Sequence, residues 1–401
     1  MKYLPYITDR SRIVAREECP RSRYLGYDLK LPTRDIRGIQ RTSISLPLLD
    51  GIEDHEAHAR LFKGDSIKDI ITDMKVRYVA VVKKRGIFKV KDEETLRVMT
   101  EQLALLEGAL RTFERIWLPR LLDEYDVVNI EQSHDWELAP NLRQKLRFDV
   151  LLRRKADGQL VIMDYKTMGY VSDGWNLKHE HSRQTSLYTQ AAEEIYGEPV
   201  DMGYIGVVKG KRTKDTAQSS PFKDQVIQYS PYCYAYVLRN GEVGNVYQTA
   251  YTNKKGYVKF RTYDEMPMVE WVDWLFENER PMVNELFVFI PPFAPTLDDR
   301  RRAKMLAIRE ELEWVEKLEH YETLKARAMR EGNLQLLQQA QDYLDFVFAP
   351  MREEVCPKYG PEYICQFDGI CHNQGALENV IAGEDPAFES REPHHETTVE
   401  K

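Results

Sequence analysis

The sequence lacks three features that would place the protein in other classes. No stretch approaches the roughly 18 consecutive apolar residues of a membrane-spanning helix. Residues 1–5 lack the apolar core of a secretory signal, and the Gly-x-x-x-x-Gly-Lys-Ser/Thr motif of a helicase motor is absent. We therefore expect a cytoplasmic protein with no membrane contact, located in the host cytoplasm if a phage encodes it.

The chain also lacks the net positive charge of proteins that package nucleic acid. Its formal net charge is −8, with 57 Lys and Arg against 65 Asp and Glu among 401 residues. A basic groove can still lie on an acidic body, so this charge neither indicates nor excludes binding to DNA. With 42% hydrophobic residues, the composition is that of a soluble globular protein with one large domain or two modest ones.

Cysteine is scarce, and five cysteines in a cytosolic chain argue against a disulfide framework. Cys356, Cys365 and Cys371 lie close together near the C-terminus, whereas Cys19 and Cys233 stand alone. An odd number with a terminal group favours a metal or cluster site over buried thiols. We expect Cys233, between two tyrosines on a predicted strand, to be a core residue.

The most informative residues that are present lie near the middle of the chain. Asp164-Tyr165-Lys166 ends the apolar run of residues 159–163, and Asp149 lies in the preceding strand-like run. Two carboxylates can hold a hard divalent cation, and a lysine beside them can orient or activate a water. This pattern is typical of metal-dependent phosphodiester hydrolysis, although a surface strand that ends in mixed charge can also show Asp-x-Lys.

Hydrophobic periodicity and turn residues predict the secondary structure. We expect helices at residues 51–64, 93–123, 181–196 and 298–348, the last a charged pair with a break near residues 332–333. Further helix is expected from residue 267. We expect strands at residues 76–90, 127–132, 145–153, 160–165, 200–208 and 224–236, with a hairpin turn at residues 156–158.

These elements divide the chain into regions that we expect to act differently. The regions are an N-terminal segment (1–50), a helical region (51–125), a nuclease-like core (126–263), a second helical region (264–349), a cysteine-containing segment (350–376) and a disordered polar tail (377–401).

Four motifs in this order resemble the RecB-like branch of the PD-(D/E)XK nucleases. They are Gly51-x-x-x-His55 in a helix, a strand bearing Asp149, an apolar strand ending in Asp164-x-Lys166-Thr167, and Gln184-x-x-x-Tyr188 in a helix. The glycine that the family often places before the first Asp is missing here. The resemblance implies an α/β fold with a restriction-endonuclease-like mixed β-sheet core flanked by helices, with helical additions and a terminal iron–sulfur staple.

The resemblance also implies a binding site for Mg²⁺ or Mn²⁺. Its ligands would be His55, Asp149, Asp164 and the carbonyl oxygen of Tyr165, and the imidazole would suit Mn²⁺ better than Mg²⁺. His58 is a rival ligand on the same helix, but only His55 has the spacing of the motif. Taken alone, His55 could equally be a surface histidine.

Further residues would take part in catalysis. Lys166 would position the attacking water and stabilise the negative charge of the developing phosphorane. Gln184 and Tyr188 lie one helical turn apart, so both face the same side of the helix. The resemblance implies that they line the groove and contact DNA or Lys166. Glu131, at the end of a strand, could be catalytic or could pair with a nearby arginine.

The cysteines resemble those of a subset of this branch that binds a [4Fe–4S] cluster. That subset includes CRISPR-adaptation exonucleases, helicase–nuclease subunits and phage exonucleases, with one cysteine before the nuclease core and three after it. Here the four would be Cys19, in a Cys-Pro-Arg element, and Cys356, Cys365 and Cys371, although the x₈ gap after Cys356 is longer than the usual x₂. Four thiolates would also suit structural Zn²⁺, with His372 as a substitute ligand.

The resemblance implies a Mg²⁺- or Mn²⁺-dependent deoxyribonuclease, and we expect an exonuclease that acts on single-stranded DNA or DNA ends. Basic residues after the core could bind phosphates, or they could be a solvated hairpin tip. These residues are Lys209, Lys211, Arg212 and Lys214. The alternatives are an endonuclease, or a DNA-end-binding subunit of a recombination or CRISPR-adaptation complex, and a phage origin is plausible.

Overall fold

The computed structural model describes much of the chain in two units. The described residues are 6–29, 39–88, 90–168, 174–208, 211–214, 226–229, 238–239, 242–243, 247–252, 258–263, 287–348, 367, 370–371 and 374–390. One unit contains residues 1–43, 133–147 and 297–401, and the other contains residues 44–132 and 148–296. Two long strands, β3 (Tyr125–Ala139) and β4 (Leu142–Arg154), contribute to both.

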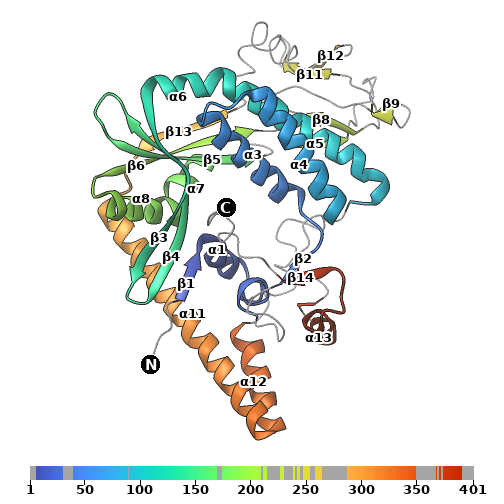
Figure 1. Ribbon diagram of the computed structural model, residues 1–401, viewed down its shortest axis with the longest axis vertical. Coiled ribbons are helices and arrows are strands. Elements are labelled where there is room, and N and C mark those ends of the chain that lie inside the picture. The colour runs from blue at the N-terminus through green and yellow to red at the C-terminus, as the bar shows by residue number, and fades with distance from the viewer. Residues whose placement is uncertain are drawn as a thin grey trace. The chain divides into compact units, whose positions relative to one another are not determined.

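A mixed β-sheet forms the centre of the second unit (Figure 1). β4 pairs antiparallel with β5 (Leu160–Met168), β5 pairs parallel with β6 (Val200–Val208), and β6 pairs antiparallel with β13 (Phe287–Phe293). The first six residues of β5 are all buried, as expected for a strand covered on both faces. The hairpin turn predicted between β4 and β5 is present, and this mixed sheet flanked by helices confirms the expected α/β class.

The parallel pair β5–β6 requires a crossover connection, which α7 (Trp175–Glu180) and α8 (Arg183–Tyr196) provide. The Ser182 side chain caps α8 by accepting from the Thr185 amide, and Gly197 ends it in the left-handed conformation. The predicted helix 181–196 is therefore confirmed. This crossover places α8 beside the sheet.

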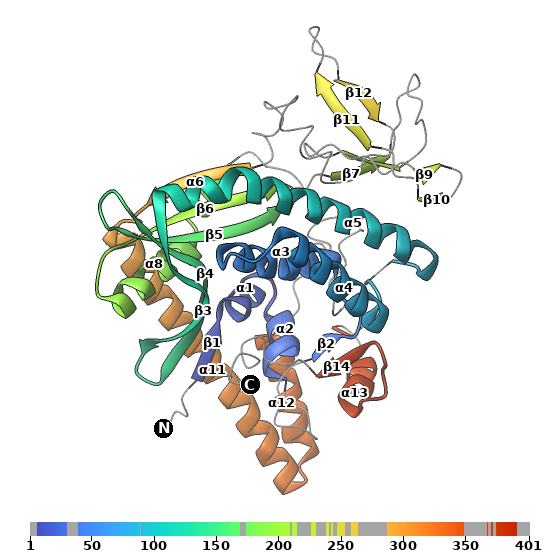
Figure 2. The ribbon, with the colours of Figure 1, turned by 45° about the horizontal axis from the view of Figure 1, so that its top comes forward.

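Helices before the sheet complete the second unit. They are α3 (Leu46–Phe62), α4 (Ile67–Arg85), α5 (Asp92–Thr112), the π-helical turn η2 (Phe113–Trp117) and α6 (Leu118–Glu124). Figure 2 shows α5 and α6 as a nearly continuous helical stretch, with α3 and α4 beside it. Their apolar faces and one side of β4, β5 and β6 share one hydrophobic core.

The strand predicted at residues 76–90 is wrong, because most of this segment belongs to α4. Its run of β-branched residues favours a strand by composition. However, Ile70, Met74, Tyr78 and Val82 recur every fourth residue and are all buried. Burial along one helix face therefore outweighs the local preference, because packing decides the conformation of a segment more strongly than propensity does.

The first unit combines both ends of the chain. Its elements are β1 (Tyr6–Asp9), α1 (Arg10–Glu18), α2 (Pro20–Arg23), the π-helical turn η1 (Tyr24–Asp28), β2 (Ile39–Arg41), α11 (Leu297–Glu331), α12 (Leu334–Val347), α13 (Gln374–Ala382) and β14 (Phe388–Ser390). β1 pairs parallel with the beginning of β4. The predicted charged helical pair is confirmed as α11 and α12, and Asn333 caps α12.

The polar C-terminal segment differs from expectation. Residues 374–390 lie mostly in the region predicted to be disordered, yet they form α13 and β14, and β14 pairs antiparallel with β2. Leu377 and Val380 on α13 are buried in the core that α11, α12 and η1 also line. A few apolar residues at helical spacing therefore order a segment whose average composition is polar.

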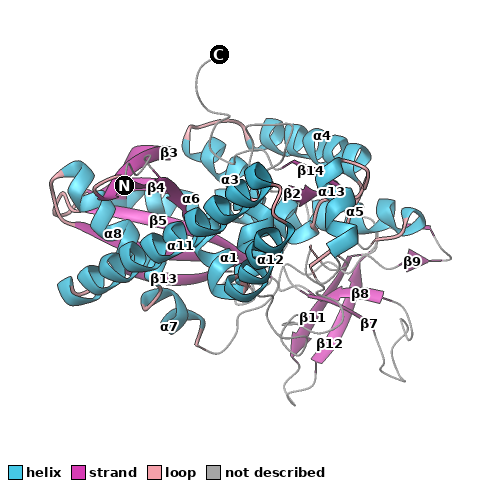
Figure 3. Ribbon diagram, turned by 90° about the horizontal axis from the view of Figure 1, so that it is seen from below, coloured by secondary structure: helices cyan, strands magenta, loops and turns pink. Residues whose placement is uncertain are grey.

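Short paired strands form the remaining described part of the second unit (Figure 3). They are β7 (Lys211–Lys214) with β8 (Val226–Tyr229), β9 (Leu238–Arg239) with β10 (Glu242–Val243), and β11 (Tyr247–Thr252) with β12 (Val258–Tyr263). β8 covers part of the strand predicted at 224–236. The helix predicted from residue 267 to the break at residues 291–292 lies outside the described residues up to 286, and its last part is wrong, because residues 287–293 pair with β6 as strand β13. Among the described helices, none has the length and apolar character needed to cross a membrane.

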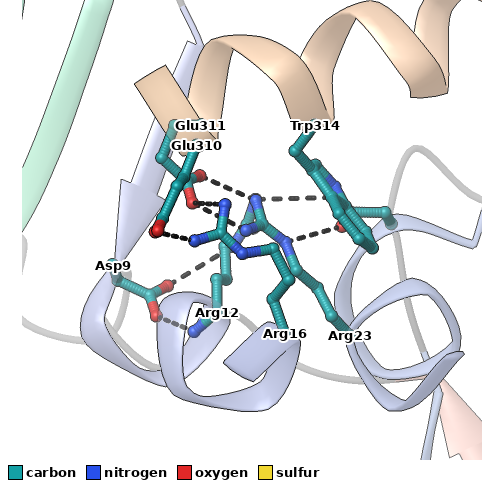
Figure 4. Close-up of polar contacts among 8 residues, drawn as sticks. Asp9, Arg12, Arg16, Arg23, Glu310, Glu311 and Trp314 are labelled. Atoms are coloured by element: carbon teal, nitrogen blue, oxygen red, sulfur yellow. Dashed lines mark hydrogen bonds and ion pairs between the residues drawn. The ribbon is translucent and has the colours of Figure 1, made fainter. Parts of the chain in front are cut away.

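A buried arginine joins the N-terminal and C-terminal parts of the first unit (Figure 4). Arg23 and Glu311 are fully buried, and both guanidinium Nη atoms lie 2.7 Å from the two carboxylate oxygens. Asp28 lies 3.4 Å from Arg23 Nε, and the Trp314 indole donates to Asp28 at 3.0 Å. Arg16 contacts Glu310 beside them. This paired geometry compensates the cost of removing the charges from water.

Replacing Glu311 by alanine is expected to lower the free energy of unfolding by about 3–5 kcal/mol, because Arg23 would lose its bidentate partner while remaining buried. Glu313 is a matched control on the same helix, since its pair with Arg309 is exposed. Glu313→Ala should cost about 0–1 kcal/mol. Urea unfolding followed by circular dichroism measures both, and equal losses would contradict a structural role for the buried pair.

Candidate metal centre

Helix α3 carries the first residue of the site. It begins at Leu46, earlier than predicted, with Pro47 in its first turn, where the missing amide hydrogen is no loss. His55 therefore lies in the middle of the helix, with well-fixed backbone on either side. The predicted end of this helix near Gly64 is confirmed, and Gly64 has a positive φ of 86°.

Three potential ligands from three elements meet in the second unit. His55 on α3, Glu131 on β3 and Asp149 on β4 each offer one atom, and these atoms all lie within 4.8 Å of one another. The Nδ1 atom of His55 is 3.3 Å from Asp149 Oδ1 and 3.5 Å from Glu131 Oε1. One imidazole nitrogen and two carboxylates make a donor set that suits a divalent cation.

The Asp149 carboxylate is held in a fixed orientation. Its Oδ2 atom accepts a hydrogen bond from the Tyr165 amide at 2.9 Å, which leaves Oδ1 directed at His55. Burial alone would raise the pKa of Asp149, but the charges of His55 and Lys166 and the Tyr165 hydrogen bond lower it to about 2. Asp149 is therefore ionised at neutral pH, as a metal ligand must be.

The same contacts change the protonation of His55. The negative charge of Asp149 raises the pKa of His55 well above its usual value, and burial opposes this without cancelling it. Hydrogen bonds to Asp149 and Glu131 add to the increase. Binding of a cation at this nitrogen must therefore displace a proton.

Glu131 has an unusual backbone conformation. Its φ is 50°, in the left-handed region, although it lies inside a strand and carries a full side chain. Such a conformation costs about 1–3 kcal/mol, and it is typical of functional sites. It also turns the strand locally, so that the Glu131 carboxylate reaches His55.

Asp164 and Lys166 form a second group beside the first. Asp164 is 2% exposed, and its two oxygens contact the Lys166 ammonium and the Gln184 amide, the latter at 3.0 Å. Lys166 therefore lies beside Asp164, as expected, whereas the observed partner of the Gln184 amide is Asp164 and the resemblance implied DNA or Lys166. Asp164 is not one of the three residues whose ligand atoms lie within 4.8 Å of one another.

The remaining predicted residues of the core take other positions. Tyr188 is buried and packs edge-on against Phe148, next to Asp149 in sequence. His58, the rival ligand, is 1% exposed, donates from Nδ1 to the Asp54 carbonyl oxygen over 2.8 Å, and stacks on the Tyr165 ring. The geometry therefore favours His55 over His58.

The residues predicted to hold a cluster or DNA are only partly described. Cys19 and Cys371 are half-buried residues of the first unit, whereas Cys356, Cys365 and Cys233 lie outside the described residues. Lys209 also lies outside them. Lys211 and Arg212 belong to β7, whose backbone alone is described.

Two residues that contact this region have no role predicted from the sequence. Asp54 precedes His55, is fully buried, and accepts a hydrogen bond from the Thr167 hydroxyl. Thr167 stands out in the sequence only as the last residue of the Asp164-x-Lys166-Thr167 motif. The available signal was the spacing of Asp54 and His58 at i and i+4, which places both on one helix face.

Comparison with known families identifies the chain. Residues 10–372 match the model of the PD-(D/E)XK nuclease superfamily. The chain belongs to this superfamily. Membership implies a metal-dependent nuclease, and the His55, Glu131 and Asp149 group has the donor atoms that such an enzyme needs. No curated protein matches the chain by sequence.

Proposed function

We propose that this superfamily member is a Mg²⁺- or Mn²⁺-dependent deoxyribonuclease of the RecB-like branch that acts as an exonuclease on single-stranded DNA or DNA ends. The observation that carries the proposal is the meeting of His55, Glu131 and Asp149 beside the contact between Asp164 and Lys166. A divalent ion would activate water and stabilise charge on the phosphate. His55, Glu131 and Asp149 would hold it, with Asp164 as a further candidate.

The neighbouring residues support this assignment through their own chemistry. Lys166 is partly exposed while the carboxylate it contacts is buried, so its ammonium can reach a phosphate or a water without leaving Asp164 uncompensated. The Gln184 amide holds the other oxygen of Asp164. Lys166 would thus orient a water and neutralise charge on a phosphate oxygen, since an ammonium donates up to three hydrogen bonds.

Lys166→Ala tests this assignment. We expect turnover on end-labelled DNA to fall by about 100-fold or more, as for the loss of one group that stabilises developing charge, while Mn²⁺ binding persists because ammonium is not a metal ligand. Lys178→Ala, an exposed lysine on α7, is the control and should cleave normally. If Lys166→Ala abolishes Mn²⁺ binding measured by calorimetry, Lys166 has a structural role and the catalytic assignment is wrong.

The preference for DNA ends needs a separate experiment. We expect the purified protein with Mn²⁺ to degrade linear single-stranded or double-stranded DNA and to spare covalently closed circles, with EDTA abolishing the activity. Cleavage of closed circles would show an endonuclease. Binding to ends without cleavage of either substrate would show a DNA-end-binding subunit of a recombination or CRISPR-adaptation complex.

We also propose that Cys19, Cys356, Cys365 and Cys371 bind a [4Fe–4S] cluster, with structural Zn²⁺ as the alternative. The described residues fit a site that joins the two ends of the chain. Tyr24 and Leu25, shortly after Cys19, pack in one core with Phe367 and Ile370, next to Cys371. Both described thiols are half-buried, as cluster ligands near a surface would be.

Anaerobically purified protein is expected to be brown, with broad visible absorbance that bleaches on reduction. Replacing the four cysteines by alanine should remove the colour and lower the thermal unfolding midpoint, because metal binding and folding are coupled. Cys233→Ala is the matched control and should leave the colour unchanged. A colourless protein that contains stoichiometric zinc would show that the four cysteines bind Zn²⁺ and not a cluster. Loss of colour in Cys233→Ala would show that the ligand set is wrong.

A further inference from the structure

Strand β5 presents alternate residues to two different helices. Asp164 contacts Lys166 and, on α8, Gln184. Tyr165 lies between Asp164 and Lys166 in the strand, and Thr167 follows Lys166. Both contact α3 instead. Successive side chains of a strand point to opposite faces, so one four-residue segment serves both a candidate catalytic group and the helix that carries His55.

The contacts with α3 lie on both sides of His55 in the sequence. The Thr167 hydroxyl donates to Asp54 Oδ2, and the Tyr165 ring stacks on His58, with centroids 4.8 Å apart and planes within 9°. Asp54 is 0% exposed and His58 is 1% exposed. Neither contact involves a group that the proposed reaction uses. The burial of Asp54 and His58 is therefore not explained by chemistry at the metal.

The backbone of this segment also reaches the metal centre. The Tyr165 amide donates to Asp149, while its ring fixes His58. A shift of β5 relative to α3 would therefore move Asp149 and His55 with respect to each other. The hydrogen bond between Thr167 and Asp54, here called the Asp54–Thr167 bridge, is the polar contact that resists such a shift.

We propose that Asp54 and Thr167 are positioning residues that set the distance between His55 and Asp149, and hence the affinity of the metal centre. The inference rests on the proposed function, because it assumes that the His55 and Asp149 side chains hold a cation. Buried hydroxyl–carboxylate bonds are directional and strong, since the acceptor is charged. The apolar contacts around α3 can keep the helix folded without the bridge, but they lack such directionality.

Thr167→Val tests the bridge, because it replaces the hydroxyl by a methyl group of similar size. We expect the Mn²⁺ dissociation constant of the full chain, measured by titration calorimetry, to rise about 10–100-fold, as for loss of other groups that orient metal ligands. Thr167→Ser keeps the donor and should restore binding close to the wild-type value. Thr72→Val, which removes a hydroxyl bonded to Lys68 within α4, is the control and should bind normally.

A second variant addresses the other partner. Asp54→Ala should weaken Mn²⁺ binding to a similar extent, and the double variant should be little worse than either single one, because both remove the same bond. Additive losses would overturn the bridge. If Thr167→Val folds poorly, Asp54→Ala against the Thr72→Val control still tests the bridge, and normal Mn²⁺ binding by Asp54→Ala would overturn it.

Thermal unfolding in EDTA separates positioning from stability. A purely structural role would lower the midpoint of Thr167→Val and leave the dissociation constant of the folded chain unchanged, which would overturn the inference while the metal site stands. Weaker binding with rescue by Thr167→Ser supports it. A wild-type chain that binds no Mn²⁺ would overturn the proposed function itself.

Discussion

The withdrawal of two carboxylates from water is the constraint on which the second unit depends. Asp149 and Asp164 are both buried, inside the neighbouring strands β4 and β5. An ionised carboxylate in such a place is tolerated only when positive charge and hydrogen-bond donors surround it. Asp149 contacts His55 and accepts from the Tyr165 amide, whereas Asp164 contacts Lys166 and accepts from Gln184. Helices α3 and α8 must therefore lie where they do, since each supplies one of these partners.

A divalent cation would change this balance of charge. Without it, His55 carries a proton because Asp149 raises its pKa, so the imidazolium takes the place that a metal would occupy electrostatically. The three side chains therefore already lie close together, and holding a cation would require little movement of them. Pre-arranged ligands reduce the entropy lost on binding, which favours affinity. Folding of the protein, and not cation binding, then supplies the free energy needed to bring the three side chains together.

Much of the site could be predicted from local patterns, whereas contacts between distant segments could not. The order of His55, Asp149, Asp164-x-Lys166 and Gln184 was readable because each motif sits on an element whose periodicity is clear. The contact of Asp54 cannot be inferred in this way, because its partner Thr167 lies 113 residues away in the sequence. The same reason explains the missed pairing of Arg23 with Glu311. The composition of α4 favours a strand, and only the recurrence of its buried residues at every fourth position indicates the helix.

The left-handed backbone of Glu131 has a consequence for how this protein can change over generations. The conformation is unfavourable for glutamate, whereas glycine or asparagine adopts it readily. A drift toward greater stability alone would therefore favour losing the carboxylate at this position. Retention of glutamate in a strained strand would then require selection for activity that outweighs the gain in stability. Position 131 is thus a place where homologues that have lost their chemistry, but kept the fold, should be recognisable from a single residue.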